Sequence, residues 1–115
     1  MAIDRSGMTL TDQNFQTLVL ESPQPVLVAC WAQGCGPWHM LAPEIAALAE
    51  AFRGQVRVAT LDVEAQPQTP QRYGVGTLPA LLFFQEGQVV DQLIGVVDRA
   101  DVAAKLHALT RSTQA

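Results

Sequence analysis

The sequence predicts an α/β fold in which a central mixed sheet of four or five strands is flanked by helices on both faces. The segment 26–32 is apolar at every position, which is typical of a strand that helices cover above and below. Helical and strand patterns alternate along the chain and end in a hairpin and a helix, so the sheet is expected to be mixed. At 115 residues, the chain is expected to form one domain over 1–115, with its core at about 9–109.

The first half of the chain predicts two helices around the central strand. After a frayed start, Thr11 or Asp12 is expected to cap a short helix that runs to residue 20. A second helix is expected over 37–52, because its apolar residues recur at steps of four, three and four. Pro43 lies inside this helix and is expected to kink it.

The second half predicts a further buried strand, a short helix, a hairpin and a last helix. Gly54 ends the preceding helix, and the strand over 56–61 follows. After a short helix over 68–73, the apolar segments 79–84 and 89–94 flank a turn with glycine, as in an antiparallel hairpin. Asp98 is expected to cap the last helix, whose buried positions are Val102, Leu106 and Leu109.

Composition argues against several classes of function. Seven basic and eleven acidic residues give a net charge of −4, so no nucleic acid partner is expected. The longest apolar run, 26–32, is far shorter than the ~20 residues that span a bilayer, so no membrane partner is expected. Two cysteines and no recognisable signal peptide favour a cytoplasmic location. The sequence carries no indication of oligomeric state.

Cys35 is the candidate nucleophile. It follows the central strand, and Pro37 suits the first position of a helix, which places Cys35 at the helix N-terminus. Unpaired backbone N–H groups and the helix dipole there favour the thiolate, which is the reactive form of cysteine. The alternative is a buried and inert thiol. No cofactor is expected, and two cysteines with two separated histidines lack the spacing of a zinc site.

Several short motifs occur in an order and spacing that resemble the thioredoxin family over residues 9–109. They are Trp31-Ala32, Cys35-Gly36-Pro37, Met40, Ala42-Pro43, Asp62-Val63, Tyr73-Gly74-Val75, Thr77-Leu78-Pro79, Gly87 and Gly95. The resemblance implies the thioredoxin fold, thiol-disulfide oxidoreductase chemistry and a role in cell redox homeostasis. It also implies that Pro79 is cis and faces Cys35 across a groove for cysteine-containing proteins or peptides. The substrate-binding residues that it implies are Trp31, Gly36, Pro37, Trp38, Thr77, Leu78 and Pro79.

The chain departs from the family pattern at the residues that complete the dithiol reaction. Trp38 stands where the family has its second cysteine, so a mixed disulfide at Cys35 requires an external thiol, for which glutathione is one candidate. Ala29 and Thr60 replace the acid and the lysine that accompany that cysteine in the family, and Gly34 replaces an aromatic residue. These departures predict a monothiol protein.

Three side chains near this segment have two interpretations each. Cys30 lies within the strand and is interpreted as a packing residue rather than a resolving thiol. Trp38 either adds apolar surface to the groove or fills the space left by Ala29. His39 is four residues beyond Cys35, a spacing that suits either a Cys/His pair or an ordinary surface residue.

Two other functions remain open at this point. One is a redox-inactive peptide-binding or chaperone-like module that retains the groove formed by Trp31, Trp38, Thr77, Leu78 and Pro79. The other is ordinary disulfide reduction coupled to a reductase. Partner binding that survives loss of Cys35 would favour the first, and turnover by the unaltered chain would favour the second.

Overall fold

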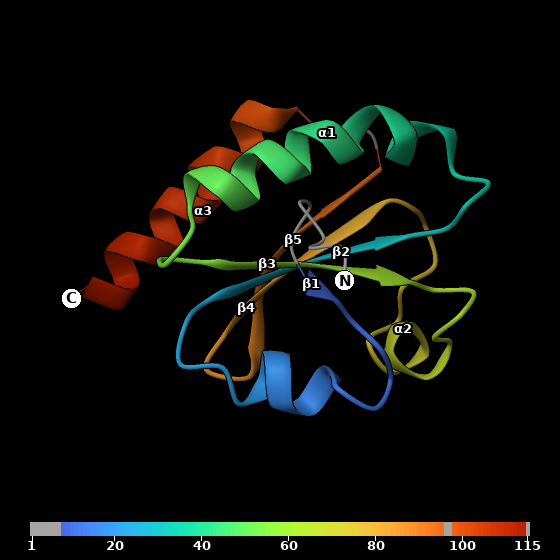
Figure 1. The fold of residues 1–115 in the computed structure, drawn as a ribbon, viewed down its shortest axis with the longest axis horizontal. Coiled ribbons are helices and arrows are strands. Elements are labelled where there is room, and N and C mark those ends of the chain that lie inside the picture. Colours follow the sequence, from blue (N-terminus) through green and yellow to red (C-terminus); the bar gives the residue numbers. More distant parts are fainter. Residues whose placement is uncertain (1–7, 96–97, 115) are drawn as a thin grey trace, which may run out of the picture.

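The computed structural model describes residues 8–95 and 98–114, and its centre is a five-stranded sheet in the order β1-β3-β2-β4-β5 (Figure 1). The strands are β1 (Met8–Thr9), β2 (Val26–Trp31), β3 (Arg57–Asp62), β4 (Ala80–Gln85) and β5 (Gln88–Ile94). Strands β1, β3 and β2 are parallel, whereas β4 and β5 run antiparallel to their neighbours. The predicted mixed sheet is confirmed. Strand β1, whose residues Met8 and Thr9 pair with β3, was not expected from the sequence, and the rest of the expected frayed start lies outside the described residues.

Helices cover both faces of this sheet (Figure 1). Helices α1 (Gly36–Ala51) and α3 (Arg99–Gln114) lie on one face, and η1 (Gln16–Leu20) and α2 (Gln68–Arg72) lie on the other. Pro43 lies inside α1, where its missing N–H removes one backbone hydrogen bond. None of the helices in the described ranges is both long and apolar enough to cross a membrane.

Two apolar clusters hold the layers together. Strand β2 contributes to both clusters, and all its residues except Trp31 are buried, as expected for a central strand. The cluster under α1 and α3 contains Leu27, Ala29, Trp38, Leu41, Ile45, Leu48, Phe52, Val56, Val58, Leu81, Phe83, Val102, Leu106 and Leu109. The cluster on the other face contains Leu10, Phe15, Val19, Val26, Val28, Cys30, Ala59, Leu61, Ala80, Leu82 and Phe84.

The first helical segment differs from the prediction. The expected helix starting at Thr11 or Asp12 is a turn followed by the five-residue π-helix η1. Thr11 caps the turn, since its Oγ1 accepts from the Asn14 N–H at 3.0 Å and its N–H donates to Asn14 Oδ1 at 2.7 Å. The short polar side chains thus satisfy the backbone locally and delay the helix.

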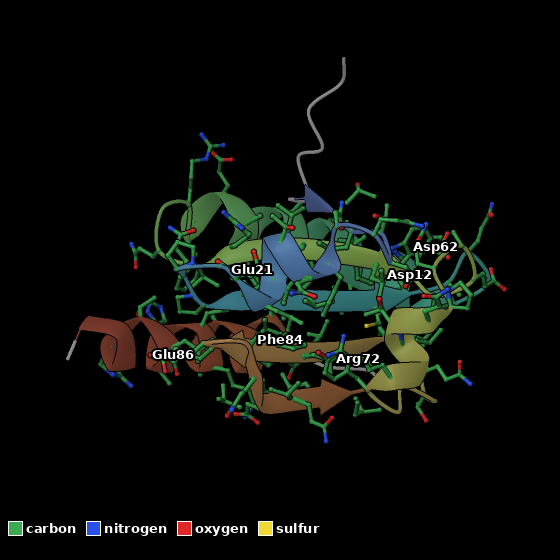
Figure 2. The ribbon with its side chains drawn as sticks, turned by 90° about the horizontal axis from the view of Figure 1, so that it is seen from below. Asp12, Glu21, Asp62, Arg72, Phe84 and Glu86 are labelled. Carbon is green, nitrogen blue, oxygen red and sulfur yellow. The ribbon has the colours of Figure 1, made fainter. Side chains whose placement is uncertain are left out.

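Asp12 binds the start of α2 instead of capping its own helix, on the same side of the sheet as the labelled Arg72 (Figure 2). Its carboxylate accepts from the Thr69 hydroxyl at 2.6 Å and from the backbone N–H groups of Thr69 and Gln68 at 2.9 and 3.3 Å. The Thr69 hydroxyl, together with these two N–H groups, lowers the pKa of Asp12 despite partial desolvation.

A two-residue turn joins β4 to β5, and the two strands form the predicted antiparallel hairpin. Glu86, which is labelled in Figure 2, and Gly87 both have positive φ, at 52° and 79°. Such a turn matches the right-handed twist of the two strands. A Cβ atom at Gly87 would lie 3.0 Å from the Leu20 carbonyl oxygen, so glycine alone fits there without a shift of the backbone.

The last helix begins one residue after Asp98, as predicted. The Asp98 carbonyl oxygen accepts from the N–H groups of Asp101 and Val102 at 3.1 and 3.2 Å. Val102, Leu106 and Leu109 are buried beneath α3, which confirms the predicted apolar stripe. This start of α3 lies at the edge of the pocket described below.

Candidate functional site

Cys35 lies at the junction between the loop that follows β2 and the start of α1. It is the N-cap residue, with φ −85° and ψ 99°, and its N–H donates to the Ala32 carbonyl at 3.0 Å. The helix starts at Gly36, so Pro37 is its second residue rather than its first. The thiol is free and the residue is partly exposed, which contradicts the interpretation of Cys35 as a buried and inert thiol.

Cys30 is separated from Cys35 by the sheet itself. Its side chain is 1% exposed and packs in the cluster under η1 and α2, whereas Cys35 packs against the cluster under α1. Burial raises the pKa of the Cys30 thiol to about 12. Cys30 is therefore a packing residue and is neither placed nor ionised to resolve a disulfide at Cys35.

Trp38 lies in the core beside the first turn of α1. It is 6% exposed, and its indole stacks on that of Trp31 with ring centroids 5.8 Å apart and planes inclined by 15°. It belongs to the same apolar cluster as Ala29. These observations support the interpretation that Trp38 fills core space, and they leave little of its ring available to a ligand.

Ala29 and Thr60 are neighbours across the parallel pair formed by β2 and β3. Both are buried, and the structure provides no charged side chain at either position. The two positions therefore lie side by side on neighbouring strands of the sheet.

The histidines do not form a pair with Cys35. His39 Nε2 lies 2.8 Å from the Gln33 carbonyl oxygen, and because a carbonyl only accepts, Nε2 carries the proton in that contact. His107 is exposed on α3, and its ring makes a T-shaped contact with that of Phe52, with ring centroids 4.9 Å apart. Within the described residues, no group of three His, Cys, Asp or Glu side chains is placed to hold a metal ion.

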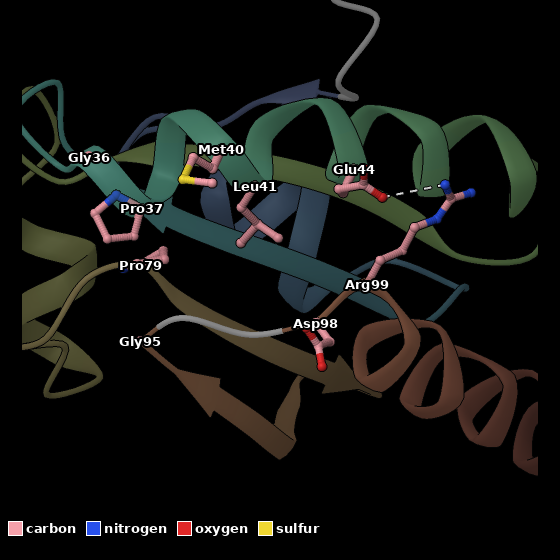
Figure 3. A pocket seen from close by; sticks show the side chains of 9 residues that line it. All are labelled: Gly36, Pro37, Met40, Leu41, Glu44, Pro79, Gly95, Asp98 and Arg99. Atoms are coloured by element: carbon pink, nitrogen blue, oxygen red, sulfur yellow. Dashed lines mark hydrogen bonds and ion pairs between the residues drawn. The ribbon is translucent and has the colours of Figure 1, made fainter.

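A pocket of about 680 Å³ opens at Gly36, the residue that follows Cys35, between α1, the start of β4 and the start of α3 (Figure 3). The Leu78–Pro79 peptide bond on its lower side is cis, the form that the resemblance implied. The Gly95 N–H donates to the Pro79 carbonyl at 2.8 Å and joins the end of β5 to this loop. The lining residues are Gly36, Pro37, Met40, Leu41, Glu44, Pro79, Gly95, Asp98 and Arg99.

The structure brings only part of the predicted substrate-binding set to this pocket. Gly36, Pro37 and Pro79 line it, whereas Trp31 and Trp38 do not line it and pack with the apolar cluster under α1 and α3. Thr77 is exposed outside the pocket, and Leu78 packs toward the opposite face of the sheet.

The other lining residues were not predicted from the sequence as part of a site. They are Met40, Leu41, Glu44, Gly95, Asp98 and Arg99. Positions 37, 40, 41 and 44 recur at steps of three, one and three, so they share one side of a helix. From that spacing, the sequence could have predicted that the site continues along α1. Asp98 and Arg99, at the start of α3, reach the pocket through tertiary packing, which the sequence spacing does not reveal.

Comparison with known proteins agrees with this fold. The family model described as thioredoxin matches residues 6–108. A thioredoxin from Chlorobaculum thiosulfatiphilum is 41% identical over 96 residues, which cover 84% of this chain and 89% of that protein. A thioredoxin from Alicyclobacillus acidocaldarius is 42% identical over 99 residues, which cover 86% of this chain and 93% of that protein. The chain therefore belongs to the thioredoxin family.

Proposed function

We propose that this protein is a monothiol member of the thioredoxin family, in which Cys35 exchanges disulfides and an external thiol completes the cycle. The observation that carries the proposal is the placement of the two cysteines. Cys35 is partly exposed at the N-terminus of α1, whereas Cys30 is buried on the opposite face of the sheet and its pKa is raised by burial. One thiol is therefore available for exchange and none is available to resolve the product.

The exchange has two balanced steps. The Cys35 thiolate attacks one sulfur of a substrate disulfide, forms a new S–S bond, and releases the other sulfur as a thiolate that takes a proton from water. An external thiolate then attacks the mixed disulfide and releases Cys35 as a thiolate. Each step breaks one S–S bond and forms one, so it needs no cofactor.

Cysteine-containing proteins or peptides are the proposed substrates, and glutathione is the proposed external thiol. The pocket beside Cys35 supports a polypeptide substrate because it is open and mainly apolar. Abundant small thiols exist in reducing compartments, so the proposal includes a cytoplasmic location and a role in redox homeostasis.

Reaction with glutathione disulfide tests the proposal. The unaltered protein and Cys30→Ala are expected to gain one glutathione each at Cys35, and excess glutathione is expected to remove it. Cys35→Ser is the matched control and should gain none. Mass spectrometry of the intact protein and of its peptides reads out each state.

Two results would contradict the proposed reaction. If the folded protein gained no glutathione at Cys35, disulfide exchange would not be its function. If Cys35→Ser still captured its peptide partners with unchanged affinity, the redox-inactive binding module would be the better description.

A further inference from the structure

We propose that the pocket beside Cys35 selects substrate segments that carry a basic side chain about four residues from the reacting cysteine, and that Glu44 and Asp98 provide this preference. The inference rests on the proposed function, because it concerns the substrate that delivers a sulfur to Cys35.

The pocket is apolar along its length and charged at one end. Pro37, Met40 and Leu41 form the side that belongs to α1, and Pro79 and Gly95 lie opposite them (Figure 3). Met40 is 82% exposed, so its apolar side chain is open to a ligand on this side of the pocket. The volume of about 680 Å³ lies within the range of about 300 to 1,000 Å³ that is typical of ligand pockets.

The charged end contains two carboxylates and one guanidinium. Arg99 Nη1 lies 3.4 Å from Glu44 Oε2, and Asp98 precedes Arg99 at the start of α3. The two side chains of this ion pair are 51% and 43% exposed. Pairing Arg99 with Glu44 leaves one negative charge in excess, so a cationic side chain complements this end of the pocket.

The ion pair does not block such a cation. A single contact of 3.4 Å between half-exposed groups is worth at most about 1 kcal/mol, and solvent screens it. A lysine or arginine from a substrate can therefore share the carboxylates without a large loss. An acidic side chain would have to draw Arg99 away from Glu44 while approaching two carboxylates.

The length of α1 sets the position of the basic residue in the substrate. Glu44 follows Cys35 by nine residues, which corresponds to roughly 13 Å along the helix axis at 1.5 Å per residue. An extended peptide rises by about 3.3 Å per residue. A side chain about four residues from the substrate cysteine therefore reaches the charged end of the pocket.

Peptide disulfides of matched sequence test the preference. Each peptide carries one cysteine linked to thionitrobenzoate, and lysine, glutamine or glutamate stands four residues before or after it. Release of thionitrobenzoate gives the rate constant of attack by Cys35. Lysine is expected to help at one of these two positions. That peptide should react about fivefold faster than the peptide with glutamine at the same position, which corresponds to an interaction of about 1 kcal/mol. This advantage should largely disappear in about 1 M salt.

Charge reversal assigns the preference to the pocket. Glu44→Lys should favour the glutamate peptide over the lysine peptide, and Asp98→Asn should reduce the preference for lysine. Glu50→Lys is the matched control, because it changes the net charge equally in the last turn of α1, where Glu50 pairs with Arg53 outside the pocket. The control should retain the preference for lysine.

The symmetric disulfide of two thionitrobenzoate molecules, which carries no peptide, tests the proposed function apart from this inference. If the unaltered protein cleaves it but reacts equally with all peptides, or fastest with the glutamate peptide, the preference for a basic residue is wrong and disulfide exchange stands. If the unaltered protein leaves it intact, disulfide exchange is wrong and the inference falls with it.

Discussion

The indole of Trp38 stacks on the indole of Trp31, with centroids 5.8 Å apart and planes inclined by 15°. Both rings and Cys35 contact the apolar cluster that contains Ala29. A cysteine at position 38 would be much smaller than this ring and would leave part of the cluster unfilled. Trp38 therefore fills space in the same cluster as the small residue Ala29 of β2.

Trp38→Ala is expected to lower the free energy of unfolding by about 3 to 5 kcal/mol, because the removed ring is almost fully buried. Unfolding in urea measures the change. Met40→Ala, four-fifths exposed and two residues further along α1, is the control and should cost less than about 0.5 kcal/mol. A loss below about 1 kcal/mol for Trp38→Ala would show that this ring does not support the core.

Trp38→Cys is expected to gain turnover in the reduction of insulin by dithiothreitol. The second thiol would lie one helical turn from Cys35 and could release the mixed disulfide within the same molecule. Trp38→Ser, which removes the same ring without adding a thiol, should gain none. Equal rates for the unaltered protein and Trp38→Cys would show that the missing thiol does not limit the reaction.

The sheet and the long helices were predictable from sequence because each carries a repeated apolar pattern. Strand β2 is buried on both faces, and the stripe from Leu41 to Phe52 follows the helical period. The π-helix η1 was not predictable, because local bonds between Thr11 and Asn14 compete with a regular first turn. The two-residue strand β1 was missed because a segment of that length carries no periodicity.

The site was predictable where it follows the chain and not where it depends on packing. Cys35 and Pro37 adjoin the turn between β2 and α1, so their positions at the start of the helix were predicted with an error of at most one residue. The sequence left two interpretations of Trp38 open, as a surface of the groove or as a core residue. The choice depends on how it packs with Ala29, which lies on a different element. The meeting of Glu44 with Arg99 joins two helices that are far apart in the sequence.

His39→Gln is expected to change the rate of Cys35 alkylation by less than about twofold, because His39 Nε2 binds the Gln33 carbonyl rather than the thiol. Alkylation by iodoacetamide at neutral pH, followed by peptide mass spectrometry, measures this rate. His107→Gln on α3 serves as the control for loss of a histidine elsewhere. A large decrease confined to His39→Gln would support a Cys/His pair.

Burial of Cys30 should make the protein less stable in base. The folded-state pKa of about 12 exceeds the ordinary value of 9.0, so above pH 9 the folded state binds more protons than the unfolded state. The contribution of this thiol is fully present below pH 9 and is lost as pH rises toward 12, by up to about 1.4 kcal/mol per pH unit.

Cys30→Ala isolates this effect, because alanine has no thiol to ionise. The free energy of unfolding of Cys30→Ala should fall less steeply than that of the unaltered protein between about pH 9 and pH 11. Urea titrations at each pH, with Cys35→Ser as background in both proteins, compare the slopes. Parallel slopes would mean that the Cys30 thiol ionises equally in the folded and unfolded states.

Asp12 should contribute to stability in the opposite direction of pH. The Thr69 hydroxyl and two backbone N–H groups hold the pKa of its carboxyl below the ordinary value of 3.8. The stabilisation is therefore present above pH 3.8 and is lost as pH falls through the folded-state pKa. Asp12→Asn and Thr69→Val should each flatten the fall in melting temperature between about pH 5 and pH 2, and the double variant should resemble Asp12→Asn. Curves that fall as steeply in Asp12→Asn as in the unaltered protein would assign the acid sensitivity to other carboxylates.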